Sequence, residues 1–135
     1  MKKILVSLFV VCVAGVVFLG PVMGAPRIEP AEALQKVAGG GAVLIDVREP
    51  SEWTGGVVSG ALLLPLSDLK GSRSVWAKEL DSAKGKELVI YCRSGNRSGI
   101  AGAILEKEGW IVWNAGSYTG MAKASAKSAE TTKPQ

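Results

Sequence analysis

The chain has 135 residues, of which 47% are hydrophobic and 21% charged, a composition that is ordinary for a globular protein and a length too short for two sizeable cores. The formal net charge is only +4, which excludes a strongly basic nucleic-acid-binding surface. The sequence contains no histidine, which excludes the Cys-His proteases and acyltransferases and the common zinc sites.

The first residues have the layout of a secretory signal peptide. Met1-Lys2-Lys3 precedes an uncharged apolar run over residues 4–19, and small residues surround Gly24. The apolar run is 16 residues long, which is short against the roughly 20 that span a bilayer. We predict a signal peptide over residues 1–24 that is cleaved after Gly24, with an uncleaved membrane anchor as the alternative. The leader is bacterial in style, so we expect an exported, periplasmic protein.

Removal of the leader changes the meaning of the cysteines and of the charge. Cys12 lies inside the apolar run, so cleavage leaves Cys92 alone and excludes an intrachain disulfide. Loss of Lys2 and Lys3 leaves 14 basic against 12 acidic residues, a net charge of +2. A lone thiol in an exported chain is either buried and inert or retained for its reactivity.

The predicted elements after the leader alternate between helices and strands. Residues 30–37 predict a short amphipathic helix, because Pro30 suits a first helical turn and the apolar residues share one face. Residues 42–47 and 86–92 are apolar runs rich in β-branched residues, typical of strands buried on both faces of a parallel sheet. Further strands are predicted over 61–64 and 110–113, and further helices over 75–80 and 97–107. This alternation indicates an α/β layer fold.

Several residues outside the strands and helices are assigned structural roles. Residues 122–135 have almost nothing to bury and predict disorder or a frayed helix, so we set a disordered tail at 125–135. Asp46 and Arg48 follow a buried strand and are expected to form a structural pair, with contact to substrate as the less favoured role. Core positions are expected for Trp53, Trp76, Trp110 and Trp113.

The segment from residue 91 to 99 carries the most chemical information. A buried strand delivers Cys92 into a polar turn containing glycine, which then opens a helix. Backbone N–H groups of such a loop and of the helix N-terminus point to one spot and carry partial positive charge. Together with the guanidinium groups of Arg93 and Arg97 they should lower the pKa of the Cys92 thiol without a base. Arg97 has the alternative role of bracing the loop.

We therefore predict that Cys92 is a nucleophile within an anion-binding loop. The alternative is a buried, inert cysteine at the end of a strand. Gly95 is expected where the backbone approaches the sulfur closely. The predicted substrate-binding residues are Arg93, Ser94, Gly95, Asn96, Arg97 and Ser98.

Four segments in order resemble the successive signatures of the rhodanese family. They are residues 44–49, 60–66 and 89–98, and the segment 114–118, which is similar to the glycine turn after that family's last core strand. The resemblance covers residues 27–124. It implies an α/β rhodanese-like domain with a central parallel sheet of about five strands, flanked by helices on both faces.

The resemblance also implies an activity, a sulfurtransferase that moves a sulfane sulfur through a persulfide on Cys92. The implied partners are a small anionic donor such as thiosulfate and a cyanide or thiol acceptor, with a protein acceptor as a further option. It implies no cofactor, no metal, no nucleic acid and no stable membrane insertion after cleavage.

Two other functions stay open at this point. One is a persulfide carrier or binding module without efficient turnover on free thiosulfate. The other is an oxyanion reductase or phosphatase using the same cysteine loop. It is disfavoured because Cys92 to Arg97 spans six residues, whereas the resemblance implies that the related phosphatases and reductases have a loop one residue longer. The chain also departs from the rhodanese pattern over residues 57–59, in place of a histidine and a proline, and at Met121, in place of a tryptophan.

Overall fold

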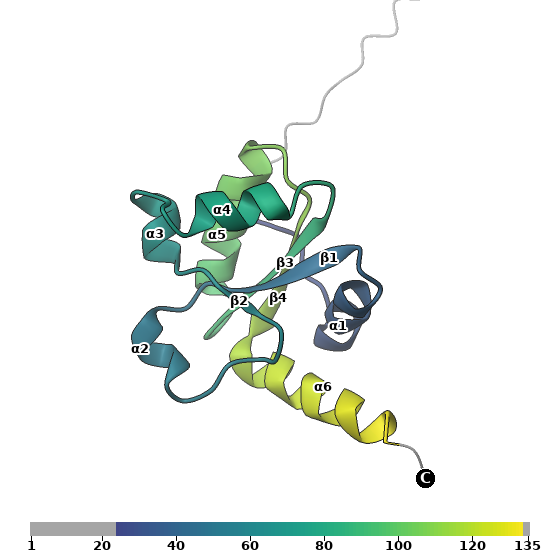
Figure 1. The fold of residues 1–135 in the computed structure, drawn as a ribbon. Coiled ribbons are helices and arrows are strands. Elements are labelled where there is room, and N and C mark those ends of the chain that lie inside the picture. Colours follow the sequence, from purple (N-terminus) through teal and green to yellow (C-terminus); the bar gives the residue numbers. More distant parts are fainter. Residues whose placement is uncertain (1–23, 134–135) are drawn as a thin grey trace, which may run out of the picture.

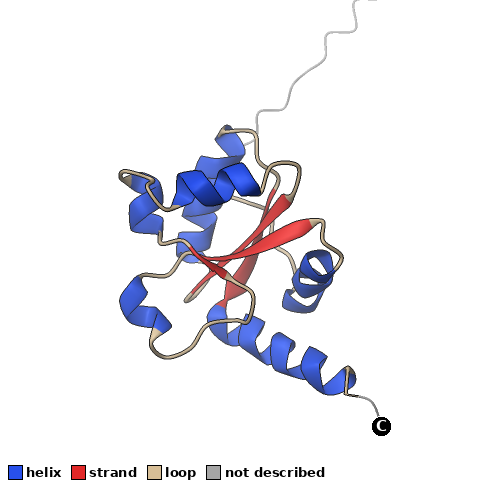
Figure 2. Ribbon diagram, in the orientation of Figure 1, coloured by secondary structure: helices blue, strands red, loops and turns tan. Residues whose placement is uncertain are grey.

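The protein, in a computed structural model that describes residues 24–133, has a parallel four-stranded sheet between two layers of helices (Figures 1 and 2). The predicted leader up to residue 23 and Cys12 lie outside the described residues. The strands are β1 (Ala42–Asp46), β2 (Leu62–Leu63), β3 (Glu87–Cys92) and β4 (Val112–Ser117), in the order β2-β1-β3-β4. The helices are α1 (Pro30–Ala38), α2 (Pro50–Trp53), α3 (Leu66–Lys70), α4 (Trp76–Ser82), α5 (Asn96–Lys107) and α6 (Tyr118–Thr131).

The arrangement confirms the predicted α/β layer fold with helices on both faces. In Figure 1, α1 and α6 cover one face of the sheet, while α3, α4 and α5 cover the other. The described residues form four strands instead of the expected five or so. In addition, Arg27 pairs with Asn114 of β4 as an isolated parallel bridge, which extends the sheet by a single residue pair at that edge.

The central strands are buried on both faces, which explains their unbroken apolar sequences. Along β3, Leu88 and Ile90 pack with the cluster under α3, α4 and α5, while Val89 and Tyr91 pack with the cluster under α1 and α6. Cys92 continues this alternation and falls on the α5 side. The register of the strand therefore decides which helix the cysteine faces.

The last strand differs from its prediction. Residues 110–113 are the predicted strand, whereas β4 begins at Val112 and runs to Ser117. The segment 114–117 has the composition of a turn, but it stays paired with β3 through a β-bulge: Ile90 pairs with Asn114, and Tyr91 pairs with Gly116. Ala115 is the extra residue on β4.

Of the two states predicted for the tail, disorder and a frayed helix, residues 125–131 adopt a helix, because α6 continues to Thr131. Met121 is fully buried and anchors the first turn, and α6 lies along α1 (Figure 1). Alanine and lysine are good helix formers, so an anchored first turn can extend through a segment that buries little. The composition of the tail alone predicts little order, because the anchoring Met121 lies before the tail begins.

The four tryptophans occupy the core to different degrees. Trp76 is fully buried, and its indole N–H donates to the Pro65 carbonyl at 2.9 Å. Trp53, Trp110 and Trp113 are only partly buried. Within residues 24–133, no helix combines the length and the apolar character that a membrane crossing requires.

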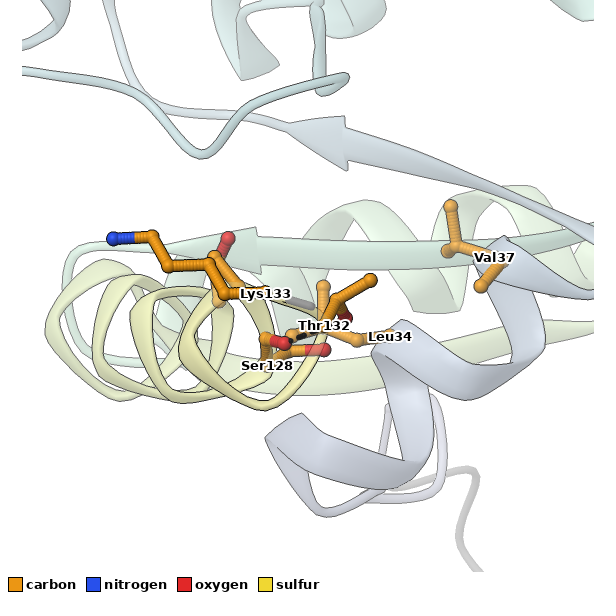
Figure 3. Close-up of a pocket in the computed structure, with 8 residues that line it drawn as sticks. Leu34, Val37, Ser128, Thr132 and Lys133 are labelled. Carbon is orange, nitrogen blue, oxygen red and sulfur yellow. Dashed lines mark hydrogen bonds between the residues drawn. The ribbon is translucent and has the colours of Figure 1, made fainter. Parts of the chain in front are cut away.

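A surface cavity of about 610 Å³ lies between α1 and the last turns of α6 (Figure 3). Leu34 and Val37 line it from α1, and Ser128, Thr132 and Lys133 line it from the other side. None of its lining residues belongs to the segment around Cys92. The chemistry of the cysteine must therefore be sought elsewhere.

Candidate active site

Cys92 is the last residue of β3, and the segment that follows it turns directly into α5. We call residues 92–98 the Cys92 loop. Gly95 has φ of +94°, in the left-handed region that favours glycine, and it is the residue before the first turn of α5. This sharp reversal folds the loop back around the sulfur.

The sulfur of Cys92 is surrounded by hydrogen-bond donors and is fully buried. The Gly95 N–H donates to Sγ at 3.0 Å, and the Ser98 hydroxyl lies 3.5 Å from it. Burial alone would raise the pKa of the thiol, but hydrogen bonds from the Ser98 side chain and from the backbone N–H groups of Ser98, Ser94 and Gly95 outweigh it and lower the pKa. The predicted direction of the pKa shift is confirmed.

The two arginines of the loop have different surroundings. Arg97 forms a two-bond ion pair with Glu52, at 2.6 and 2.7 Å. The hydrogen bond from Arg97 is the main cause that lowers the pKa of Glu52 to about 2. Glu52 therefore balances the charge of Arg97, as expected if Arg97 braces the loop against α2, while the charge of Cys92 also contributes to raising the pKa of Arg97. Arg93 is exposed.

Of the polar loop residues, only Ser98 orients the loop through a side chain that is fully buried. Ser94 contributes its backbone N–H to the sulfur, and its side chain is on the surface with that of Asn96. No group of three or more histidine, cysteine, aspartate or glutamate side chains suited to a metal ion occurs within residues 24–133.

Asn114 is the site residue that sequence reasoning missed. Its Oδ1 accepts from the Ser98 hydroxyl at 2.7 Å and from the Gly116 N–H at 3.0 Å. Its Nδ2 donates to the carbonyl of Gly95 at 2.9 Å. The Asn114 side chain thus binds the Cys92 loop at Gly95 and at Ser98. The β-bulge at this position orients the side chain toward the loop. The bulge has no local signature in the sequence.

Asp46 and Arg48 form the expected structural pair beside the loop. Asp46 is fully buried and accepts from the Arg48 Nη2 at 2.8 Å and from its Nε at 3.0 Å. Arg48 also donates to the Gly56 carbonyl at 2.8 Å, and its guanidinium lies 4.1 Å from the ring centre of Tyr118. Asp46 is the largest cause that raises the pKa of Arg48. The pair ties the segment after β1 to the start of α6.

The family is decided by a comparison with protein-family models. The model described as the rhodanese-like domain matches residues 29–124. The chain belongs to the rhodanese-like domain family. In this rhodanese-like protein two of the departures from the family pattern, Val58 and Met121, are buried in the cluster under α1 and α6, whereas Val57 and Ser59 are exposed.

Curated relatives of this rhodanese-like chain include proteins named for sulfur transfer. It is 37% identical over 68 residues to the sulfurtransferase of Allochromatium vinosum, covering 50% of this chain and 58% of that one. It is 30% identical over 82 residues to the human thiosulfate:glutathione sulfurtransferase, covering 55% of this chain and 71% of that one. The chain spans about half the length or less of other curated relatives that it matches, covering 58%, 30% and 49% of three of them.

Solved structures give the same fold. The human single-domain sulfurtransferase superposes with a TM-score of 0.53 at 27% identity, covering 74% of this chain and 97% of the human protein. This likeness includes the parallel sheet with helices on both faces. The family and the fold are thus shown by independent comparisons.

Proposed function

We propose that this protein is a sulfurtransferase that moves a sulfane sulfur from thiosulfate, or a similar anionic donor, to a cyanide or thiol acceptor through a persulfide on Cys92. The observation that carries the proposal is that the Gly95 N–H and the Ser98 hydroxyl both lie against the Cys92 sulfur, at 3.0 and 3.5 Å, in surroundings that lower the pKa of the thiol. The names of the relatives support the same class of reaction. A thiolate held by N–H donors is ready to attack without a general base.

The first half-reaction transfers sulfur to the enzyme. The Cys92 thiolate attacks the outer sulfur of thiosulfate, a new Sγ–S bond forms, and the S–S bond of thiosulfate breaks. Sulfite leaves with the electron pair of the broken bond, and the persulfide keeps one negative charge. Both the incoming and the outgoing species are anions, so the N–H groups stabilise each of them in turn.

The second half-reaction returns the enzyme to its thiolate form. An acceptor thiolate or cyanide attacks the terminal sulfur of the persulfide, and the Sγ–S bond breaks. The electron pair of that bond returns to Cys92, where the same donors stabilise the thiolate. A protein acceptor would need to present its thiol at the same edge of the sheet.

The test is the intact mass of the purified protein before and after treatment with thiosulfate, beside Cys92→Ser. We expect the wild type to gain one sulfur, about 32 Da, that cyanide or a thiol removes, and we expect no gain in Cys92→Ser. Absence of the adduct from the wild type contradicts thiosulfate as the direct donor.

The burial of Cys92, which has no exposed surface, favours a persulfide carrier as the second candidate. A carrier receives the sulfur from a partner protein and turns over slowly on free thiosulfate. Steady-state kinetics separate the two functions: turnover of about 1 per second or faster with thiosulfate and cyanide is typical of enzymes and excludes a pure carrier.

A further inference from the structure

The Cys92 loop, which contains Arg93 and Arg97, has a further cation beside it, and this cation comes from a distant part of the sequence. The Arg27 guanidinium lies against the backbone of Gly95: a Cβ at position 95 would be only 3.1 Å from Nη1 and 3.3 Å from Nη2 of Arg27. A Cβ at Gly116 would lie 3.5 Å from the same Nη1. The guanidinium reaches this place because both neighbouring positions are glycines.

Arg27 is placed there by the edge of the sheet. The Asn114 N–H donates to the Pro26 carbonyl at 2.8 Å, and the Ile28 N–H donates to the Asn114 carbonyl at 3.1 Å. These two bonds flank Arg27 and fix its backbone beside β4. Asn114 therefore binds the N-terminal segment through its backbone and the Cys92 loop through its side chain.

The charge of Arg27 is not balanced within the part of the chain that the structure describes. The ion pairs of residues 24–133 engage Arg48, Arg73 and Arg97, and none engages Arg27. Arg97 is neutralised by Glu52, as described above. Arg27 is thus a cation next to the loop with donors available for an anion.

A surface cavity of about 600 Å³ opens beside this guanidinium. Arg27, Ser94, Asn96 and Asn114 line it together with Gly95, whose N–H is bonded to the sulfur of Cys92. The cavity offers room for a small anion between a guanidinium and the outer side of the loop. The exposed Ile100 of α5 also lines it.

We propose that Arg27 is a specificity-determining residue that binds the anionic group of the sulfur donor in this cavity. The proposal rests on the proposed function for the identity of the donor as a sulfur oxyanion. A planar guanidinium suits the oxygens of a sulfonate or sulfite, to which it can donate two hydrogen bonds at once. Cys92 does not line this cavity, so Arg27 captures the donor on the outer side of the loop, and the donor then moves to the thiol that the N–H groups hold.

The test compares two alkylating reagents of the Cys92 thiol that differ in charge. Iodoacetate carries a carboxylate, whereas iodoacetamide is neutral. In Arg27→Gln we expect the rate with iodoacetate, relative to that with iodoacetamide, to fall about tenfold, which is the loss of a charge-assisted hydrogen bond. Arg27→Lys should keep much of the ratio, and the control Lys78→Gln, which removes an exposed charge on α4, should keep all of it.

The same variants are then assayed with thiosulfate, for which Arg27→Gln should raise KM about tenfold with a smaller change in kcat. An unchanged reagent ratio, or an equal loss with both reagents, overturns the proposal, because an equal loss reports a change in the thiol or the loop alone. If the wild type gains no sulfur from thiosulfate, the proposed function fails, while the reagent ratio still tests the role of Arg27.

Discussion

The segments after β1 and β3 lie side by side at one edge of the sheet, and both gather hydrogen-bond donors around one buried acceptor. After β1 the acceptor is the Asp46 carboxylate, and its donors carry the positive charge of Arg48. After β3 the acceptor is the Cys92 sulfur, and its donors are a hydroxyl and backbone N–H groups without a formal charge.

This difference separates a structural cluster from a reactive one. The negative charge of Asp46 is balanced by a cation that is itself held by backbone carbonyls, so the cluster has no capacity for another anion. The donors around Cys92 are oriented toward a group whose charge appears only when the thiol ionises. These donors favour the thiolate, and they can form the same hydrogen bonds to another anion that takes the place of the thiolate.

The largest expected effect is on stability and comes from the β1 side. Asp46→Ala leaves the Arg48 guanidinium buried without its partner, so the free energy of unfolding should fall by about 3–5 kcal/mol. Cys92→Ser should change it by less than about 1 kcal/mol while it abolishes persulfide formation. Urea denaturation of both variants measures these changes.

The control for Asp46→Ala is Lys84→Gln, which breaks the highly exposed ion pair with Asp81 and should leave the free energy of unfolding almost unchanged. Equal stabilities for Asp46→Ala and Lys84→Gln would show that the buried pair is no more important to the fold than a surface pair. The contrast between the two strand ends would then be lost.

The next effect is on reactivity and comes from the β3 side. Ser98→Ala removes one donor to Sγ, so the pKa of the Cys92 thiol should rise from its lowered value. Because a lowered pKa keeps the thiolate down to a lower pH, the variant should lose thiolate at a higher pH than the wild type. At pH 7 we expect iodoacetamide to alkylate the variant about tenfold more slowly.

The measurement is the pH dependence of alkylation, with the exposed Ser82→Ala as the control. A Ser98→Ala profile that coincides with that of the wild type contradicts the role of the hydroxyl. The Ser98 hydroxyl has one hydrogen and lies near both Sγ and the Asn114 Oδ1, so it can donate to only one of them at a time. Its donation to Sγ is expected to dominate once the thiolate has formed.

The sequence predicts the fold and the nucleophile because both depend on local patterns. Apolar runs of strand length mark β1 and β3, and the order of a buried strand, a cysteine, a glycine turn and a helix marks the Cys92 loop. The parallel direction of the strands then follows from their alternation with helices, whereas the strand order and the register, with its bulge in β4, were not predicted. The short α2 and α3 carry too little periodicity to be predicted.

The partners of the loop could not be predicted, because they come from remote segments. Asn114 is separated from Ser98 by 16 positions and Glu52 from Arg97 by 45, and only the folded chain brings each pair together. Arg27 reaches Gly95 from the residues before α1. In the sequence Arg93 and Arg97 are the nearest cations to Cys92, whereas the approach of Arg27 to Gly95 follows only from the folded chain.

The smallest expected effect joins the two sides, because Glu52 lies on α2, after β1, and pairs with Arg97 of the Cys92 loop. The Arg97 hydrogen bond lowers the pKa of Glu52 from 4.5 to about 2. A carboxylate with a lowered pKa stabilises the fold above about pH 4.5, and this contribution is lost as the pH falls toward 2. Glu52→Gln should therefore lower the free energy of unfolding by about 1 kcal/mol at neutral pH and by less in acid.

Urea denaturation between pH 6 and 3 measures the pH-dependent difference, at roughly half-unit steps, with the exposed Glu32→Gln as the control. The wild type should approach the stability of Glu52→Gln as the pH falls, whereas a constant difference contradicts an ionic pair.

In Glu52→Gln the Arg97 charge is no longer balanced, so the Cys92 thiolate should be favoured further and alkylation by iodoacetamide at pH 7 should accelerate about twofold. The substitution would then lower the stability of the fold and raise the reactivity of Cys92. Both changes would follow from the loss of the Glu52 carboxylate that balances the positive charge of Arg97.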